Sequence, residues 1–213
     1  MKEKHSESRY MTNLRPVILA EARRCFCERG IRAVKMDEIA QRLGISKRTI
    51  YELFATKEAI LVEVLQKILD DRAAYFADFS DNCDNVFDLL LEVLRRQLEF
   101  SSQTHTSFFS DMQRYPKVQK VFDKCLAEQS SKSKDFFIRG VKQGYFRTDI
   151  DYDVFLKVSG DAMKMVRTQP SFQGIPHKAL LLNFLCVIIR GISTEKGMKR
   201  IDDFAKKYTE TSV

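Results

Sequence analysis

The residues best suited to chemistry lie together in the second half of the stretch 36–54. This half carries cationic and hydroxyl side chains at nearly adjacent positions, namely Lys47, Arg48, Thr49 and Tyr51. Such groups donate hydrogen bonds to phosphate oxygens, and an arginine also reads guanine through two parallel bonds. The pattern favours contact with a nucleic acid, with an ordinary solvated helix surface as the alternative.

Two short helices joined by a tight turn would present this surface. The first is predicted from apolar residues at helical spacing, which are Met36, Ile39, Ala40 and Leu43. Gly44 follows, where a left-handed backbone costs glycine little. Ser46 can then cap a second helix over 47–54 that turns Ile50 inward. Since Ala40 is the small residue that two steeply crossing helices need, the stretch has the helix-turn-helix pattern.

The distribution of charge supports the same interpretation. The chain has 213 residues and a formal net charge of +7. Residues 1–60 hold 13 Lys/Arg against 8 Asp/Glu, so most of the excess positive charge lies in the segment with the helix-turn-helix. A basic segment suits a polyanion, because each neutralised phosphate releases condensed counterions. Charge alone leaves a solvated basic face as an equal alternative.

Hydrophobic periodicity predicts an all-α fold of about nine to ten helices, with no alternating stretches that would form a sheet. Helices are expected over about 13–29, 36–43, 47–54, 57–79, 86–102, 104–115, 116–142, 152–167 and 177–192, with a further one over 195–208. Proline in the first turn is tolerated, so Pro16 marks the first helix start, after a polar arm. We divide the chain into a three-helix head, 1–57, and a helical domain, 58–213.

The predicted helix 177–192 is apolar on more than one face, so it must be buried on most sides. A homodimer in which this helix and the helix 152–167 pack against their copies as a four-helix bundle would bury it. The alternative is that the helix lies at the centre of its own domain.

Neither catalysis nor a cofactor is indicated. The three histidines, His5, His105 and His177, are far apart in sequence, and no nucleophile–base pair or metal-ligand spacing is present. We therefore predict no enzyme, no metal site and no cofactor. No apolar run approaches the roughly 20 residues that span a bilayer, and the N-terminus lacks a secretory pattern, so we expect a cytoplasmic protein without a membrane partner.

The five cysteines are an odd number without a C-x-x-C spacing, at positions 25, 27, 83, 125 and 186. Cys25 and Cys27 stand two apart on a predicted helix, so they point to different faces and do not easily share a metal. We interpret all five as reduced thiols, and a redox-sensing role stays open.

Between Ile18 and Leu61 the spacing of particular residues matches a family pattern. The matching positions include Ile18, Ala22, Phe26, Gly30, Asp37, Ala40, Gly44, Ser46, Thr49, Tyr51, Phe54 and Lys57. On these residues, about a fifth of the chain, it resembles the TetR family of bacterial transcriptional regulators. The loop 144–149 and the segment 189–197 also look like segments of some members.

The resemblance implies a homodimeric regulator with a DNA-binding head and a variable helical domain that usually binds a small, often apolar ligand. It implies base or phosphate contacts in the major groove of a double-stranded, pseudo-palindromic operator from the start of the second motif helix, that is from Ser46, Lys47, Arg48 and Thr49. Tyr51 and Lys57 would contact the phosphate backbone. We expect a repressor that its ligand releases from the operator.

Three positions depart from the family pattern. Lys35 stands where threonine or serine usually caps the first motif helix, so the cap is lost and a charged phosphate contact becomes possible. Leu53 replaces a tyrosine or histidine of many members, which removes one phosphate contact. Arg48 replaces a common glycine, and it is our candidate for reading the base sequence.

The second domain carries an aromatic set that an apolar effector between helices would use: Phe100, Phe108, Phe109, Met112, Phe122, Phe137 and Met163. Ordinary core is the alternative for each of them. The competing function is a helix-turn-helix protein whose second domain engages a protein partner or no ligand at all.

Overall fold

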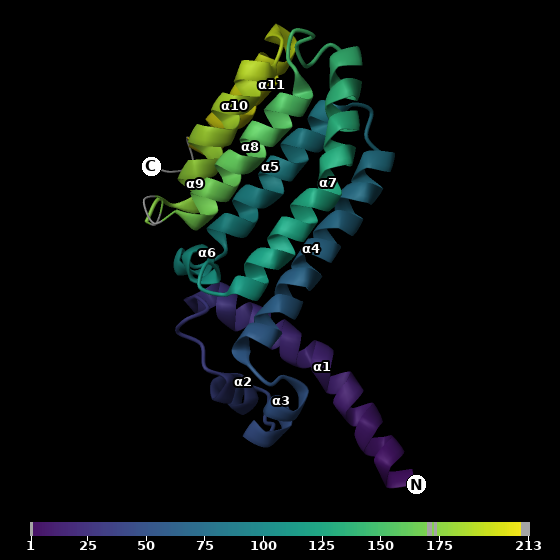
Figure 1. Ribbon diagram of the computed structural model, residues 1–213, viewed down its shortest axis with the longest axis vertical. Helices are drawn as coiled ribbons and strands as arrows, with labels where there is room; N and C mark the ends of the chain where they lie inside the picture. Colours follow the sequence, from purple (N-terminus) through teal and green to yellow (C-terminus); the bar gives the residue numbers. More distant parts are fainter. Residues whose placement is uncertain (1, 170–171, 173, 210–213) are drawn as a thin grey trace. The chain divides into compact units, whose positions relative to one another are not determined.

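Helices make up nearly all regular structure in the described part of the chain (Figure 1). The computed structural model describes residues 2–169, 172 and 174–209. Their helices are α1 (Lys2–Arg29), α2 (Met36–Arg42), α3 (Lys47–Leu53), α4 (Lys57–Asp81), α5 (Val86–Ser102), α6 (Ser107–Met112), α7 (Pro116–Lys142), α8 (Tyr152–Thr168), α9 (His177–Leu180), a π-helical turn (Leu181–Leu185), α10 (Cys186–Ile192) and α11 (Glu195–Thr209). The predicted all-α fold is confirmed, with a helix count close to the predicted one.

The chain divides into two compact units, each built from separate stretches. The N-terminal unit comprises Met1–Asp71 and Gln103–Asp123, and the C-terminal unit comprises Arg72–Ser102 and Lys124–Val213. Both α4 and α7 begin in the first unit and end in the second. The division of roles at residue 57 stays a prediction, because compactness does not say which residues bind a partner.

Helix α1 begins much earlier than predicted. It starts at Lys2, and Pro16 lies inside it rather than in its first turn. The prediction of a start near residue 13 is therefore wrong. Hydrophobic periodicity detects only helices that bury an apolar stripe, whereas lysine, glutamate and arginine form helices readily without one. Pro16 removes one backbone donor, but the remaining hydrogen bonds on either side carry the helix through.

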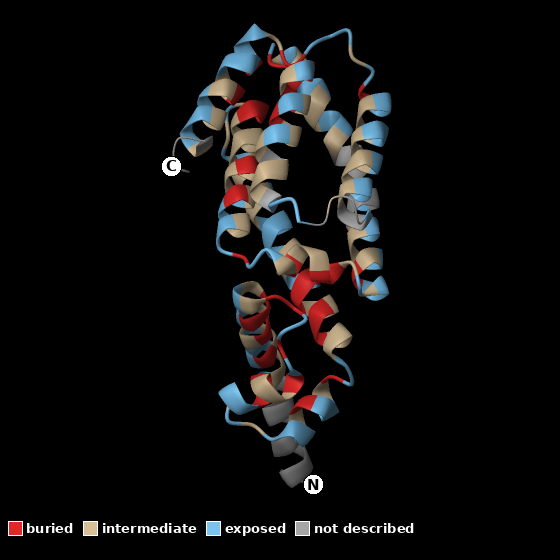
Figure 2. Cartoon of the chain, turned by 90° about the vertical axis from the view of Figure 1, so that its left-hand side faces the viewer, coloured by how far each residue is buried: buried red, intermediate tan, exposed pale blue. Residues whose placement is uncertain are grey.

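The core of the N-terminal unit forms where α1 meets the two motif helices and the start of α4 (Figure 2). Its fully buried side chains include Ile18, Ala22, Phe26, Ile39, Ile50, Phe54, Ile60 and Leu61. Ala40 is only 1% exposed, as expected of a small residue where two helices cross. Each fully buried large apolar side chain contributes about 1.5–3 kcal/mol relative to exposure. These residues therefore fix the position of α2 and α3.

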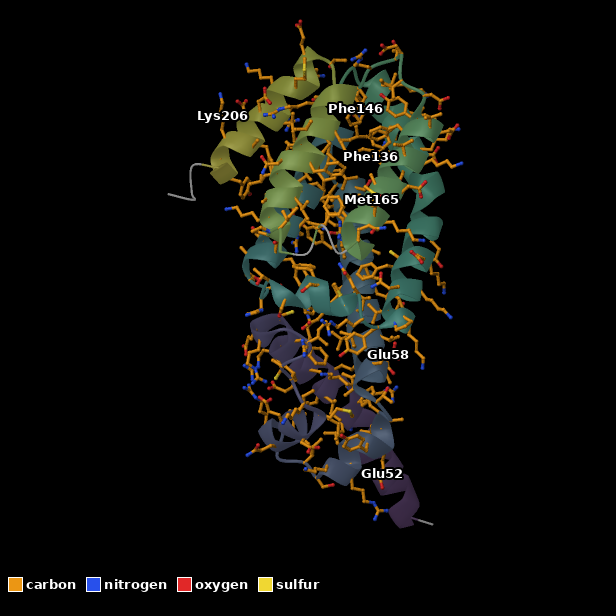
Figure 3. All side chains as sticks on the ribbon, turned by 60° about the vertical axis from the view of Figure 1, so that its left-hand side comes forward. Glu52, Glu58, Phe136, Phe146, Met165 and Lys206 are labelled. Carbon is orange, nitrogen blue, oxygen red and sulfur yellow. The ribbon has the colours of Figure 1, made fainter. Side chains whose placement is uncertain are left out.

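The C-terminal unit is organised around an aromatic cluster. The rings of Phe87 and Tyr145 stack with their centroids 5.1 Å apart, and Phe137 lies 5.1 Å from both Phe146 and Tyr152. Phe136 joins the cluster at 6.0 Å from Phe146 (Figure 3). Phe87 and Phe146 are almost completely buried. This cluster forms one continuous hydrophobic core with the inner sides of α5, α10 and α11.

The loop after α7 is fixed to the junction between α10 and α11. The backbone N–H of Arg147 donates to the carbonyl of Ile192 at 2.9 Å, and that of Thr194 donates to the carbonyl of Tyr145 at 3.0 Å. Gly197 packs directly on this contact, because a β-carbon there would lie 2.5 Å from the Tyr145 carbonyl oxygen. The segments 144–149 and 189–197, both noted in the sequence, thus form one structural joint.

Candidate nucleic-acid interface

The turn between α2 and α3 is built by backbone hydrogen bonds around one glycine. Gly44 has a φ of 65°, in the left-handed region that favours glycine. Its N–H donates to the carbonyl of Gln41 at 3.1 Å, and the N–H of Ile45 donates to the carbonyl of Ala40 at 3.0 Å. These two bonds satisfy the carbonyls at the end of α2 in the Schellman arrangement. The predicted turn at Gly44 is confirmed.

Helix α3 begins with the predicted serine cap. The Oγ atom of Ser46 accepts a hydrogen bond from the N–H of Thr49 at 3.0 Å, and the two hydroxyl oxygens lie 2.8 Å apart. Such a cap satisfies one of the unpaired donors of the helix N-terminus and contributes about 1 kcal/mol. Ser46 and Thr49 therefore fix the start of the helix that carries the cations.

The outer face of α3 presents the predicted cations to solvent. The side chains of Lys47 and Arg48 are 70% and 87% exposed, and Tyr51 is 48% exposed. Lys47 forms an ion pair with Asp37 of α2, and Arg48 Nε donates to Glu52 Oε1 at 2.6 Å. The pairing with Asp37 raises the pKa of Lys47, so its ammonium stays charged. The surface is cationic, but each cation has a nearby carboxylate.

Lys35 lies at the entry to α2, as predicted, and it does not cap the helix. Its backbone is extended, with φ −101° and ψ 147°, and its side chain makes no capping hydrogen bond. Lys35, Asp37 and Lys47 share an open groove of about 530 Å³, and Lys35 and Tyr51 share a second of about 430 Å³. Lys35 is thus exposed on the same face as the start of α3.

Lys57 has a role that the sequence did not indicate. Its ammonium donates to the carbonyls of Ile31 and Val34, each at 2.9 Å, and to that of Arg32 at 3.4 Å. Burial lowers the pKa of this lysine. An ammonium has three N–H donors, and here all three have carbonyl acceptors. Lys57 also lines the second open groove together with Lys35 and Tyr51, so the phosphate contact that the resemblance implied stays a prediction.

Asp111 of α6 is a further residue that sequence reasoning missed. This carboxylate is 7% exposed and accepts a hydrogen bond from the N–H of Arg32 at 2.8 Å. Ser107, one turn earlier, packs against Gly30, where an added β-carbon would lie 2.0 Å from the serine oxygen. The loop before α2 is therefore held by α6 on one side and by Lys57 on another. An acidic residue within an apolar helix was the only available signal.

Comparison with known proteins agrees with this geometry. Residues 18–64 match the family described as bacterial regulatory proteins, tetR family. The HTH-type transcriptional repressor KstR2 of Mycobacterium tuberculosis is 27% identical over 185 residues, which cover 84% of this chain and 92% of the relative. Over residues 18–64 the chain is therefore similar to TetR-family regulators. The matched proteins are named as transcriptional regulators and not as enzymes.

Three further similarities are informative about this protein. The HTH-type transcriptional activator FasR of Mycolicibacterium smegmatis is 41% identical over 54 residues, 25% of each chain. The solved structure of the ketosteroid transcriptional regulator KstR2 of Mycobacterium tuberculosis has a TM-score of 0.54 at 26% identity, over 85% of this chain and 95% of that one. A TetR-family regulator from Marinobacter aquaeolei, at 17% identity and a TM-score of 0.67, shows the shared fold.

The predicted ligand residues do not lie in one unit. Phe108, Phe109, Met112 and Phe122 belong to the N-terminal unit, and Phe100, Phe137 and Met163 belong to the C-terminal unit. Phe108 and Phe109 contact each other edge to face at 5.5 Å. Phe137 is part of the aromatic core, which favours the structural interpretation for that residue. Sequence distance alone could not separate the two sets.

The described residues also bear on other functions that this protein could have. No helix in this part of the chain is long and apolar enough to cross a membrane. No group of three histidine, cysteine, aspartate or glutamate side chains is arranged there to hold a metal ion. Burial raises the pKa of the Cys25, Cys27 and Cys186 thiols, which disfavours the reactive thiolate at these three positions.

Proposed function

We propose that this TetR-family protein is a sequence-specific DNA-binding repressor that acts in the cytoplasm, with residues 1–57 as its DNA-binding part. The observation that carries the proposal is the exposed cationic face of α3. The turn at Gly44 and the cap at Ser46 fix the helix that presents this face. A helix of this kind places its first residues against base edges in the major groove. The relative that aligns with most of the chain is named a repressor, which supports the direction of regulation.

Each residue of the surface has a distinct proposed role. Arg48 reads guanine through its planar guanidinium, whereas Lys35 and Lys47 bind phosphates as point charges. The Tyr51 hydroxyl donates to a phosphate oxygen. Ser46 and Thr49 contact the backbone next to the helix start. Lys57 acts indirectly, since its ammonium holds the loop that leads into α2.

We also propose that the protein binds its operator as a homodimer through residues 152–167 and 177–192. Exposed apolar side chains on these segments support this: Val154 is 58%, Val158 62%, Met165 48% and Val187 59% exposed. On α8, residues 154, 158 and 165 recur at helical spacing and so form one stripe. Two heads spaced about 34–36 Å apart would reach successive major grooves of a pseudo-palindromic site.

The residues 58–213 are proposed to form the dimerisation and effector domain, with a small apolar molecule as the releasing ligand. The full-length relative is described as a ketosteroid transcriptional regulator, which supports a largely apolar effector. The candidate contacts that lie within the C-terminal unit are Phe100, Phe137 and Met163. A ligand that binds better to a state unable to reach both half-sites shifts the dimer off DNA by no more than its differential affinity.

Helix α4 is the proposed connection between effector and head. It begins in the N-terminal unit, where Lys57 holds the loop 31–34, and it continues to Asp81 in the C-terminal unit. A displacement of α4 would therefore pull on the residues that lead into α2. Helix α6 contacts the same loop through Asp111.

Selection of bound duplexes from a random pool by the full-length protein tests the proposal. We expect one enriched, pseudo-palindromic sequence whose affinity falls steeply with salt, as phosphate contacts require. Arg48→Ala should relax the preference at one symmetric pair of positions. A pool that shows no enrichment at any salt concentration would disprove sequence-specific DNA binding.

A further inference from the structure

Glu52 pairs with the residue proposed to read the base sequence. Arg48 Nε donates to Glu52 Oε1 at 2.6 Å, and the two side chains stand one turn apart on the outer face of α3. Glu52 is labelled in Figure 3. The side chain of Arg48 is 87% exposed and that of Glu52 is 46% exposed, so DNA bound to this face of α3 could contact both.

Helix stability does not explain this pair. The helix dipole favours acidic residues in the first turn and basic residues in the last. Helix α3 has neither an acidic residue in its first turn nor a basic residue in its last turn. In the Arg48–Glu52 pair the cation comes first, which is the weaker of the two orientations for an i,i+4 pair. The charges of α3 are therefore arranged against the dipole.

The geometry of the bond suits a positioning role instead. It engages Nε, whereas a bidentate contact with guanine O6 and N7 can use the two terminal nitrogens of the same planar group. Because the guanidinium is planar, a carboxylate on Nε sets the direction in which the terminal nitrogens point. A lysine in place of Arg48 could not be oriented in this way.

The carboxylate also changes how strongly the surface attracts phosphates. A guanidinium beside a carboxylate carries less local positive charge, and phosphate attraction supplies most of the affinity for non-cognate DNA. The positive charge of Lys47 is reduced in the same way, because Asp37 of α2 forms an ion pair with it. Specificity is the ratio of the affinity for the operator to the affinity for non-cognate DNA. A group that weakens non-cognate binding therefore raises specificity even without a new attractive contact.

We propose that Glu52 is a specificity-determining, positioning residue: it orients Arg48 for base readout and reduces attachment to DNA of any sequence. This inference rests on the proposed DNA-binding function. In this role Glu52 does not contact a base itself, because it acts through Arg48. The prediction is therefore that removing the Glu52 carboxylate raises the affinity for random DNA and lowers the discrimination between bases at the position that Arg48 reads.

A double-mutant cycle on the full-length protein tests this inference. Glu52→Ala, Arg48→Ala and the double variant are titrated with the selected operator, with operators changed at the position that Arg48 reads, and with a random duplex. Glu52→Gln keeps an oxygen acceptor but removes the charge, so it separates orientation from electrostatics. Glu128→Ala is the matched control, because Glu128 pairs with Lys124 as an i,i+4 neighbour on α7.

We expect Glu52→Ala to lower base discrimination at that position about five- to tenfold and to tighten random-duplex binding about two- to fivefold. Glu52→Gln should keep most of the discrimination and show the tighter random binding. In the Arg48→Ala background, Glu52→Ala should leave discrimination unchanged. Glu128→Ala should match the wild type throughout.

Two results would overturn the positioning role. One is unchanged discrimination in Glu52→Ala while Arg48→Ala still alters it. The other is an equal loss of discrimination with and without Arg48, which would mean that Glu52 contacts a base itself. Both results presuppose an operator, so they leave the proposed function standing. A wild-type protein that selects no operator would overturn the proposed function together with this inference.

Discussion

The carboxylate of Asp111 accepts a hydrogen bond from the backbone N–H of Arg32 at 2.8 Å, across 79 positions of sequence. Arg32 lies in the loop that leads into α2, and Asp111 lies on α6. A carboxylate binds a partly buried backbone donor more strongly than a neutral acceptor would. This single bond therefore ties the entry of the helix-turn-helix to a helix more than seventy residues later.

Replacing Asp111 should destabilise the N-terminal unit. Asp111→Leu removes a partly buried hydrogen bond to a charged acceptor, which costs about 1.5–3 kcal/mol. Urea denaturation followed by circular dichroism measures this loss. Asp203→Leu on the exposed side of α11 is the control and should change stability by about 0.5 kcal/mol or less. Equal stability of the two variants would contradict the importance of this bond.

Lys57→Met should separate a structural role from a phosphate contact. The variant removes three donors from the carbonyls of residues 31, 32 and 34, so the free energy of unfolding should fall by about 1–3 kcal/mol. The salt dependence of operator binding should stay the same, since no phosphate contact is lost. A slope reduced by about 0.9 would instead show that Lys57 neutralises a phosphate. Lys67→Met, on the exposed side of α4, is the matched control.

Gly197→Ala should weaken the joint between the loop 143–149 and α11. The added β-carbon would lie 2.5 Å from the Tyr145 carbonyl oxygen, which is backbone and cannot move aside cheaply. We expect a loss of about 1–3 kcal/mol and a lower melting temperature. Gly191→Ala meets nothing within 4 Å, so the same change there should be neutral or slightly stabilising. If both glycines tolerated alanine equally, the close packing at Gly197 would be refuted.

Stability should depend on Glu92 in acid. This carboxylate accepts hydrogen bonds from Arg95, Arg96 and Tyr75, and the bond with Arg95 is the main reason that its pKa falls from 4.5 to about 2. A pKa lowered by folding means that the stabilisation is complete above 4.5 and is lost as the pH falls toward 2.

Urea denaturation at several pH values tests that dependence. The wild type should be more stable than Glu92→Gln near neutral pH, by about 1.5–3 kcal/mol as for a hydrogen-bonded charge. The difference should shrink steadily below about pH 4.5. Glu128→Gln, whose glutamate is 65% exposed, is the control and should show no such trend. A difference that stayed constant down to pH 2 would exclude the lowered pKa.

Val158→Glu should disrupt the proposed homodimer. It places a charge in the middle of the exposed apolar stripe of α8, and burying that charge without a partner is strongly unfavourable. Sedimentation velocity should show dimer dissociation constants raised at least about tenfold, and operator affinity should fall because the two half-sites lose their coupling. Ile138→Glu, at an apolar residue that is 40% exposed on α7, is the control. A variant that remained dimeric would place the interface elsewhere.

Sequence by itself determined the helix-turn-helix and the residues on its surface. Gly44, Ser46 and Ala40 act through neighbours within five positions, so their types and spacing are sufficient to predict the turn, the cap and the crossing. The same local rule explains the failure at α1. Its first turns have no apolar stripe, and hydrophobic periodicity indicates a helix only through such a stripe.

Only the tertiary structure decided how that motif is held and which charges are paired. Lys57 and Asp111 bind the loop 31–34 from positions more than 20 and more than 70 residues away, and no spacing rule predicts such partners. The segments 144–149 and 189–197 could be recognised in the sequence, but the contact between Gly197 and Tyr145 is seen only in the folded chain. Backbone donors and carbonyls carry no sequence signature, so contacts made through them appear only when the chain is folded.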